Sequence, residues 1–246
     1  MRRSEPERLP LDFSFHVVDL PLVLTLILLE GVLSFDNAAV LAAMVLRLPS
    51  EQRRKALLYG LVGAYVFRVA AILGVSFIIA NPILRVAGGL YLVWLAVRHF
   101  LHRGHAHLAG RPPIRIFGLT AFWATVVAVE ITDLAFALDQ VLVAVAMTDR
   151  VLLIIMASMV AIGLLRLSAF YMTRLMTWFP TLEHLAYVAV GFVGLKLLIA
   201  VTGEYLGRDW HIPTPISIAV TLSLLVAPVV VKAVLELTRR DKAAQV

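Results

Sequence analysis

Two acidic stretches interrupt long apolar runs in this sequence, at residues 28–37 and 129–140. Their polar side chains include carboxylates, amides and hydroxyls, among them Glu30, Ser34, Asp36 and Asn37 in the first stretch, and Glu130, Asp133, Asp139 and Gln140 in the second. An ionised carboxylate inside a bilayer costs at least ~2.5–3.5 kcal/mol on insertion scales, so such acids usually face a cavity, a partner or an ion. In a membrane-spanning chain, this pattern predicts a buried cation site.

The available ligand atoms narrow the class of cation. The chain has no cysteine, and oxygen ligands favour hard divalent cations such as Mn²⁺, Mg²⁺ or Ca²⁺. Three basic residues, Arg68, Arg166 and Lys196, also fall at the expected membrane depth. The alternative interpretation is that the acids pair with these bases and only hold helices together. Because five acids outnumber three bases, an ion or protons must neutralise the remainder.

Helical geometry separates the polar residues of each stretch. Steps of three, four and seven residues return to nearly the same face of a helix. The residues that share such a face are Glu30, Ser34 and Asn37 in the first stretch, and Asp133, Ala137 and Gln140 in the second. Asp36 and Asp139 lie about 120° away around the helix. A regular helix therefore cannot direct all of these side chains at one ion.

Two arrangements resolve this difficulty. In the first, the helices break near Ser34–Phe35 and Ala137–Leu138, and the two aspartates, Asp36 and Asp139, become N-caps of second half-helices. In the second, Asp36 and Asp139 face a different partner, such as a buried arginine. The sequence leaves both arrangements open.

Composition indicates an all-α, polytopic membrane protein. Of the 246 residues, 61% are hydrophobic and 15% are charged, whereas soluble domains are roughly half apolar and about a quarter charged. The net charge of +6 is explained by basic residues that lie at the membrane surface, since no nucleic-acid-binding pattern appears. We therefore expect the lipid bilayer, divalent cations and protons as partners, and no nucleic acid.

Seven apolar runs are long enough to cross a bilayer as helices, which takes roughly 20 residues per span. They are Leu20–Leu46, Ala56–Ile79, Pro82–Leu101, Phe117–Met147, Val151–Tyr171, Glu183–Val201 and Ile212–Leu235. We treat residues 1–246 as a single transmembrane domain. Lys and Arg concentrate after the first, third and fifth runs and at the C-terminus, which predicts an N-terminus outside and a C-terminus in the cytosol of a bacterial plasma membrane.

The sequence also resembles itself at a distance of 103 residues. This shift places Asp36-Asn37 on Asp139-Gln140 and Glu30 on Asp133. The repeats, about 20–101 and 117–201, each hold three spans, and a final helix follows at about 212–235. An odd number of spans makes the copies run in opposite directions, with a shared site at the bilayer midplane. Chance similarity between apolar helices is the alternative.

The motifs Glu30–Ala38 and Glu130–Asp139 resemble the signature segments of the TerC family of integral membrane proteins, as do Gly191–Lys196 and Arg166. This resemblance implies a seven-span protein of the LysE superfamily, whose members include manganese exporters and proteins linked to tellurium resistance. It also implies an ion path lined by Glu30, Asp36, Asn37, Glu130, Asp133 and Asp139. Gln140 stands where the family is expected to have serine, which affects the expected selectivity.

A histidine-rich segment, residues 98–107, offers a second metal-binding possibility. His102, His105 and His107 could capture transition metals, although a solvated polar loop has the same composition. No zinc-protease, hydrolase or phosphate-loop motif is present, so we expect no enzyme and no prosthetic group. The expected function is Mn²⁺ efflux coupled to protons. The alternatives are a membrane-embedded assembly or metallation factor, export of another ion such as Ca²⁺, and transport of a basic amino acid.

Overall fold

The computed structural model describes residues 17–101 and 118–208, together with scattered positions between 210 and 226. Within these residues the chain is helical, with turns and no strand, which confirms the all-α prediction. Within residues 17–101 and 118–208, a 3₁₀ turn at Val17–Asp19 precedes eight α-helices: α1 Leu20–Leu33, α2 Phe35–Val45, α3 Ser50–Leu73, α4 Val75–Ala80, α5 Pro82–Leu101, α6 Ala121–Met147, α7 Val151–Trp178 and α8 Thr181–Tyr205.

Four helices, α3, α5, α7 and α8, are individually long and apolar enough to cross a membrane. The pair α1 and α2 meets the same test as one span bent by 53°. The acid-bearing α6 is not among them. The outer faces of α3, α5 and α7 carry apolar side chains such as Val62, Ile83 and Leu167, each more than half exposed, as lipid contact requires. The predicted seventh span lies largely outside the described residues, so the seven-span count remains a prediction.

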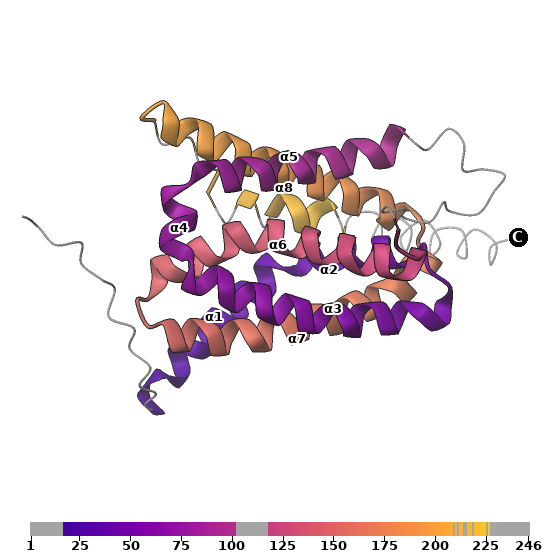
Figure 1. The fold of residues 1–246 in the computed structure, drawn as a ribbon, viewed down its shortest axis with the longest axis horizontal. Helices are drawn as coiled ribbons and strands as arrows, with labels where there is room; N and C mark the ends of the chain where they lie inside the picture. Colours follow the sequence, from indigo (N-terminus) through magenta and orange to yellow (C-terminus); the bar gives the residue numbers. More distant parts are fainter. Residues whose placement is uncertain are drawn as a thin grey trace, which may run out of the picture.

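The long helices form three layers in Figure 1. One outer layer contains α5 and α8, the other contains α3 and α7, and the two acidic helices α2 and α6 lie between them. The α5–α8 crossing is close because Gly89 and Gly194 face each other. A Cβ atom on Gly194 would lie 2.8 Å from the Gly89 carbonyl oxygen. Small residues at such crossings are typical of helix packing in membranes.

The middle layer contains a helix, α2, that is almost completely buried. From Ala38 to Leu46, α2 and its C-cap have almost no exposed surface, and they pack against α6, α7 and α8. The largest hydrophobic cluster surrounds this helix. Polar groups on α2 and α6 are therefore held in a nearly waterless interior, where unpaired charges are costly.

The predicted break in the first acidic helix is confirmed. Helix α1 ends at Leu33 and α2 begins at Phe35, with Ser34 between them. The prediction that Asp36 is the N-cap is wrong, because Ser34 occupies that position and Asp36 lies in the first turn of α2. The Asp36 side chain instead accepts a hydrogen bond from the Asn37 N–H, at 3.0 Å.

The predicted break in the second acidic helix is wrong. Helix α6 continues through Ala137 and Leu138, so Asp139 lies inside the helix and caps nothing. The local residues explain the difference, because Ala and Leu are strong helix formers. The first stretch has Gly31 and Ser34 in the corresponding region, and both residue types weaken a helix.

Helix packing follows a pattern that a two-fold relation between the repeats would produce. The predicted correspondence matches α1 and α2 with α6, α3 with α7, and α5 with α8. The contact of α3 with α6 then has its counterpart in that of α7 with α1 and α2. The contact of α5 with α6 likewise corresponds to that of α8 with α2. This pattern agrees with an internal repeat, whose inverted orientation remains a prediction.

Candidate functional site

The structure describes all eleven site residues that the sequence predicts. Nine are buried: Glu30, Ser34, Asp36, Asn37, Arg68, Glu130, Asp133, Gln140 and Arg166. The other two, Asp139 and Lys196, are partly exposed. Ten of the eleven residues lie on α1, α2, α3, α6, α7 and α8, and Ser34 lies at the break between α1 and α2. Their acids and bases form three clusters, each containing one base.

The Arg68 cluster joins four helices. Arg68 Nη2 donates to Gln140 Oε1 at 2.7 Å, and Gln140 Nε2 donates to Ser34 Oγ at 3.0 Å. Arg68 Nη1 lies 3.8 Å from Glu30 Oε1, and that oxygen accepts a hydrogen bond of 2.6 Å from Ser158 Oγ. Glu30 is thus neutralised by a base on α3 and hydrogen-bonded from α7. Gln140 links this base to the break between α1 and α2.

The Arg166 cluster contains two acids from successive turns of α6. Arg166 Nη2 lies 2.7 Å from Glu130 Oε1 and 3.4 Å from Asp133 Oδ2. The same nitrogen donates to the Gly60 carbonyl at 3.4 Å. Glu130 lies directly against α3, because a Cβ atom added to Gly60 would come within 2.5 Å of Glu130 Oε1, and one added to Gly63 within 2.7 Å of Oε2. Two glycines on α3 therefore make room for this carboxylate.

The Lys196 cluster is the most accessible of the three. Lys196 Nζ lies 2.9 Å from Asp139 Oδ2, and the two side chains are 12% and 29% exposed. Asp36 is buried and lies within electrostatic range of both Lys196 and Asp139. This cluster therefore combines the Lys196–Asp139 ion pair with a second, buried aspartate from α2 within electrostatic range.

Each of the two arginine clusters retains oxygen atoms that no hydrogen bond satisfies. The buried atoms without a partner include Glu30 Oε2, Glu130 Oε2 and Asp133 Oδ1, together with Asn37 Nδ2. Nitrogen atoms of the two arginines, Arg68 Nη1 and Arg166 Nη1, are unpartnered in the same way, although buried polar atoms are normally paired. Among the described residues of the three clusters, five carboxylates face three bases, which leaves two negative charges in excess.

The predicted ion-path residues do not form one ligand shell in this conformation. Within the described part of the chain, no group of three or more histidine, aspartate or glutamate side chains is close enough to hold a metal ion. The acids are separated because Arg68, Arg166 and Lys196 each hold their own partners. The sequence predicted these three bases and the possibility of pairing, but not the distribution of the acids among them.

Three residues at these clusters escaped the sequence analysis. Ser158 interrupts the apolar run between Arg150 and Arg166 as a lone hydroxyl, a signal that could have identified it. Gly60 and Gly63 gave no such signal, because their role depends on the position of Glu130. In the histidine-rich segment, His102, His105 and His107 lie outside the described residues. His99, which precedes them, has Nε2 2.9 Å from Nδ1 of His184 on α8.

Comparison with known proteins places this architecture among bacterial membrane proteins. The chain is 41% identical to the membrane protein YceF of Bacillus subtilis over 181 residues, which cover 72% of this chain and 70% of YceF. It is 34% identical to the B. subtilis membrane protein YkoY over 198 residues, which cover 72% of the chain but only 59% of that relative. The inner membrane protein YgdQ of Escherichia coli is 28% identical over 204 residues, 77% of this chain and 82% of YgdQ.

None of these relatives' names indicates a catalytic activity, and no solved structure matches this chain. The model of the integral membrane protein TerC family matches residues 16–242, which include all three clusters. The match thus extends over nearly all of the sequence. The chain belongs to the TerC family of integral membrane proteins.

Proposed function

We propose that this protein exports a divalent cation, with Mn²⁺ as the first candidate, from the cytosol across the plasma membrane. The observation that carries the proposal is the excess of buried carboxylates over bases in the middle layer. Such an excess is costly in a dry interior unless positive charge is supplied. Oxygen ligands select hard divalent cations, and resemblance to manganese exporters favours Mn²⁺ among them.

The proposed binding position lies at Asp36 and Asp139, with Asn37 beside them. Lys196 occupies the charge-neutralising position there when no ion is bound. Its side chain is 12% exposed, compared with 2% for Arg68 and 4% for Arg166, so its ammonium group has the best access to water. A lysine is also a point charge on a flexible stem, whereas an arginine is a rigid fork. An arriving cation therefore displaces Lys196 more easily than either arginine.

The two arginine clusters support this position and are proposed to change partners during transport. Alternating access requires one three-helix repeat to rock against the other. Glu30, Glu130 and Asp133 each carry an unpartnered oxygen, so they can hold the ion for a time as it passes. Gln140 differs from the expected serine, and both ends of its amide are engaged with Arg68 and Ser34. We therefore assign Gln140 to positioning Arg68 and not to binding the ion.

Protons are the proposed counter-ion. The return step must neutralise the emptied carboxylates with another positive charge, and a proton is the smallest one available. Manganese transport into vesicles that neither moves protons nor responds to a proton gradient would rule out this coupling.

The test is ion flux in reconstituted vesicles, with Mn²⁺, Mg²⁺ and Ca²⁺ compared side by side. D36N and D139N should each reduce Mn²⁺ flux at least tenfold while the protein remains folded. D149N is the matched control, because Asp149 is an exposed acid at the turn between α6 and α7. Normal flux in both D36N and D139N would overturn the proposal, and a faster flux of Mg²⁺ or Ca²⁺ would reassign the ion.

The ion pairs also favour a second candidate, a membrane-embedded assembly or metallation factor with structural acids. Glu130–Arg166 and Asp139–Lys196 join different helices, and no three-acid group exists among the described residues. The triple variant E130Q/D133N/R166M, which replaces Arg166 together with both of its acids, separates the two candidates. Replacing a purely structural buried ion-pair group as a whole is often tolerated, so an assembly factor should keep its activity, whereas a transporter should lose flux.

A further inference from the structure

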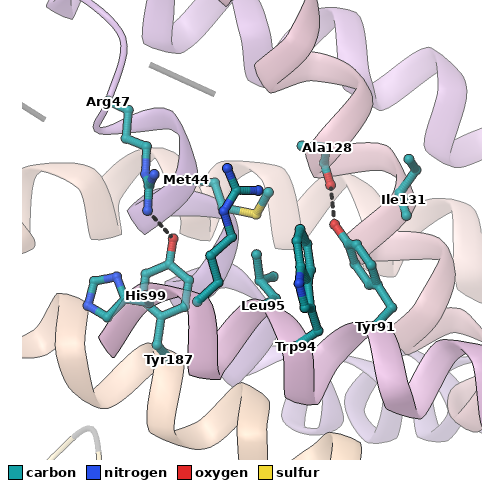
Figure 2. Close-up of a pocket in the computed structure, with 10 residues that line it drawn as sticks. Met44, Arg47, Tyr91, Trp94, Leu95, His99, Ala128, Ile131 and Tyr187 are labelled. Atoms are coloured by element: carbon teal, nitrogen blue, oxygen red, sulfur yellow. Dashed lines mark hydrogen bonds between the residues drawn. The ribbon is translucent and has the colours of Figure 1, made fainter. Parts of the chain in front are cut away.

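A pocket of about 280 Å³ lies apart from the three clusters, between α2, α5, α6 and α8 (Figure 2). Its polar lining comes from Arg47, which follows α2, from Arg98 and His99 near the end of α5, and from Tyr187 in the second turn of α8. This is the end of the bundle that contains Arg53, Arg54 and Lys55 at the start of α3. The positive-inside rule assigns such an end to the cytosolic leaflet.

The charge of this pocket suits an anion. Two guanidinium groups line it, and none of its lining residues is acidic. Arg47 Nη2 donates to Tyr187 Oη at 3.5 Å, a long contact that a better acceptor can replace. Arg98 lies over the Trp94 ring at 5.0 Å. A vestibule for a divalent cation would not be lined by two arginines, so this pocket lies off the proposed ion path.

The rest of the lining is apolar and reaches the outer surface of the bundle. Trp94 on α5 and Ile131 on α6 are 50% and 44% exposed, and Leu95 and Met44 lie deeper. Figure 2 shows Trp94 and Tyr91 side by side, with Ile131 beyond them and Arg47 on the opposite side. The pocket therefore combines a basic end with an apolar side that faces the membrane.

We propose that this pocket binds the phosphate headgroup of an anionic phospholipid from the cytosolic leaflet. Arg47 and Arg98 hold the phosphate, and an acyl chain lies over Trp94 and Ile131. Basic pockets between transmembrane helices on the cytosolic side bind anionic headgroups in this way, and tryptophan is favoured at the level of the headgroups. The lipid would connect the end of α2 to α5. The inference does not depend on which ion the protein transports.

Trp94 provides a direct probe of this site. In a W123F/W178F/W210F background, Trp94 is the remaining tryptophan. The protein is reconstituted in phosphatidylcholine vesicles that contain increasing amounts of phosphatidylglycerol with brominated acyl chains, which quench tryptophan on contact. We expect half-maximal quenching at a few mole per cent of this lipid. Brominated phosphatidylcholine should quench only in proportion to its share of the bilayer.

Charge variants test the role of the arginines. R47Q/R98Q should weaken the apparent affinity for this lipid by roughly 10- to 30-fold, as expected from the loss of two basic residues near the surface, so that quenching no longer saturates at a few mole per cent and follows only the lipid's share of the bilayer. K55Q/R174Q is the matched control, because it removes two exposed basic residues outside the pocket at the same end. An unchanged midpoint in R47Q/R98Q, or an equal shift in both double variants, would overturn the proposal.

Two further arms remove the remaining ambiguity. The comparison of the two brominated lipids uses a protein with intact pocket residues, so it tests the lipid site even if R47Q/R98Q does not fold. Equal quenching by both lipids refutes the site. Glycerol phosphate is then added at millimolar concentration. If it relieves the quenching, the pocket is a site for a soluble anion and the lipid assignment is wrong. If it does not, the acyl chain is required for binding.

Discussion

Replacing Gly60 with alanine tests the geometry of the Arg166 cluster. A Cβ atom at position 60 would lie 2.5 Å from Glu130 Oε1 and 3.3 Å from Arg166 Nη1, whereas ordinary contacts begin near 3.4 Å. The carboxylate must therefore move by roughly 0.5–1 Å, since overlapping atoms cannot be compressed. It is held by Arg166 at 2.7 Å, so this movement lengthens a buried, charge-assisted hydrogen bond.

Overpacking of this kind costs about 1–3 kcal/mol. For a chain of this length, each kcal/mol lowers the unfolding temperature by roughly 2–4 °C. We therefore expect Gly60→Ala to unfold about 2–12 °C below the parent protein in detergent. The control is Gly31→Ala on α1, where nothing lies within 4 Å of the added atom. That variant should match the parent or exceed it slightly, because alanine favours helices.

The shorter Glu130→Asp side chain relieves the predicted overlap. In a double-mutant cycle, Gly60→Ala should therefore cost less in the Glu130→Asp background than in the parent. The measurement is thermal unfolding of the four proteins, followed by circular dichroism. If Gly60→Ala and Gly31→Ala have the same stability, Glu130 does not lie against α3 and the cluster geometry is wrong.

Three other substitutions should lower the free energy of unfolding by different amounts, each measured by thermal unfolding in detergent. Arg166→Met should cost about 3–5 kcal/mol because it leaves buried acids without a counter-charge, and a small loss would show that those acids are not ionised partners of Arg166. Lys196→Met should cost about 1 kcal/mol or less, since Asp139 is partly exposed; a larger loss would contradict the accessibility of this pair. Gly194→Ala should cost about 1–3 kcal/mol, because the added Cβ meets the Gly89 backbone at 2.8 Å, and normal stability would exclude the close α5–α8 crossing.

Sequence reasoning identified the polar residues of the core well, because a charge in an apolar run is conspicuous. Ten of the eleven predicted residues belong to helices of the bundle, Ser34 lies at the break between α1 and α2, and the three bases pair with acids as one of the two interpretations expected. Neither periodicity nor spacing indicated which acid pairs with which base. That assignment depends on how α3, α7 and α8 pack around α6, which the sequence pattern does not encode locally.

The two acidic stretches look alike in sequence but differ in backbone. Both have an acid followed by an amide, and the position of that acid, about 120° around the helix from the other polar residues, led to the hypothesis of a break in each. The break exists at Ser34 and is absent at Ala137–Leu138. Gly31 and Ser34 in the first stretch are the local signal that distinguishes them, and weighing helix propensity at these positions would have predicted one break.

The sequence could not predict which residues matter only because their side chains are small. Gly60 and Gly63 look like ordinary glycines of an apolar helix, and their importance follows from the position of Glu130 on another helix. Ser158 is intermediate, because a single hydroxyl among apolar residues suggests a buried partner without naming it. Its partner, Glu30, is 128 positions away in the sequence.

The burial of α2 has a consequence for how the protein is made. This helix is near the start of the chain, yet much of its surface is covered by α7 and α8, which are synthesised much later. Until those helices enter the bilayer, Asp36 and Asn37 have neither their final neighbours nor a dry enclosure. The first helices of the nascent protein must therefore remain in lipid or beside the insertion machinery until α7 and α8 have been made. The core closes only near the end of translation. A chain that terminates before α7 would consequently lack the helices that cover α2. We expect membrane quality control to degrade such a chain.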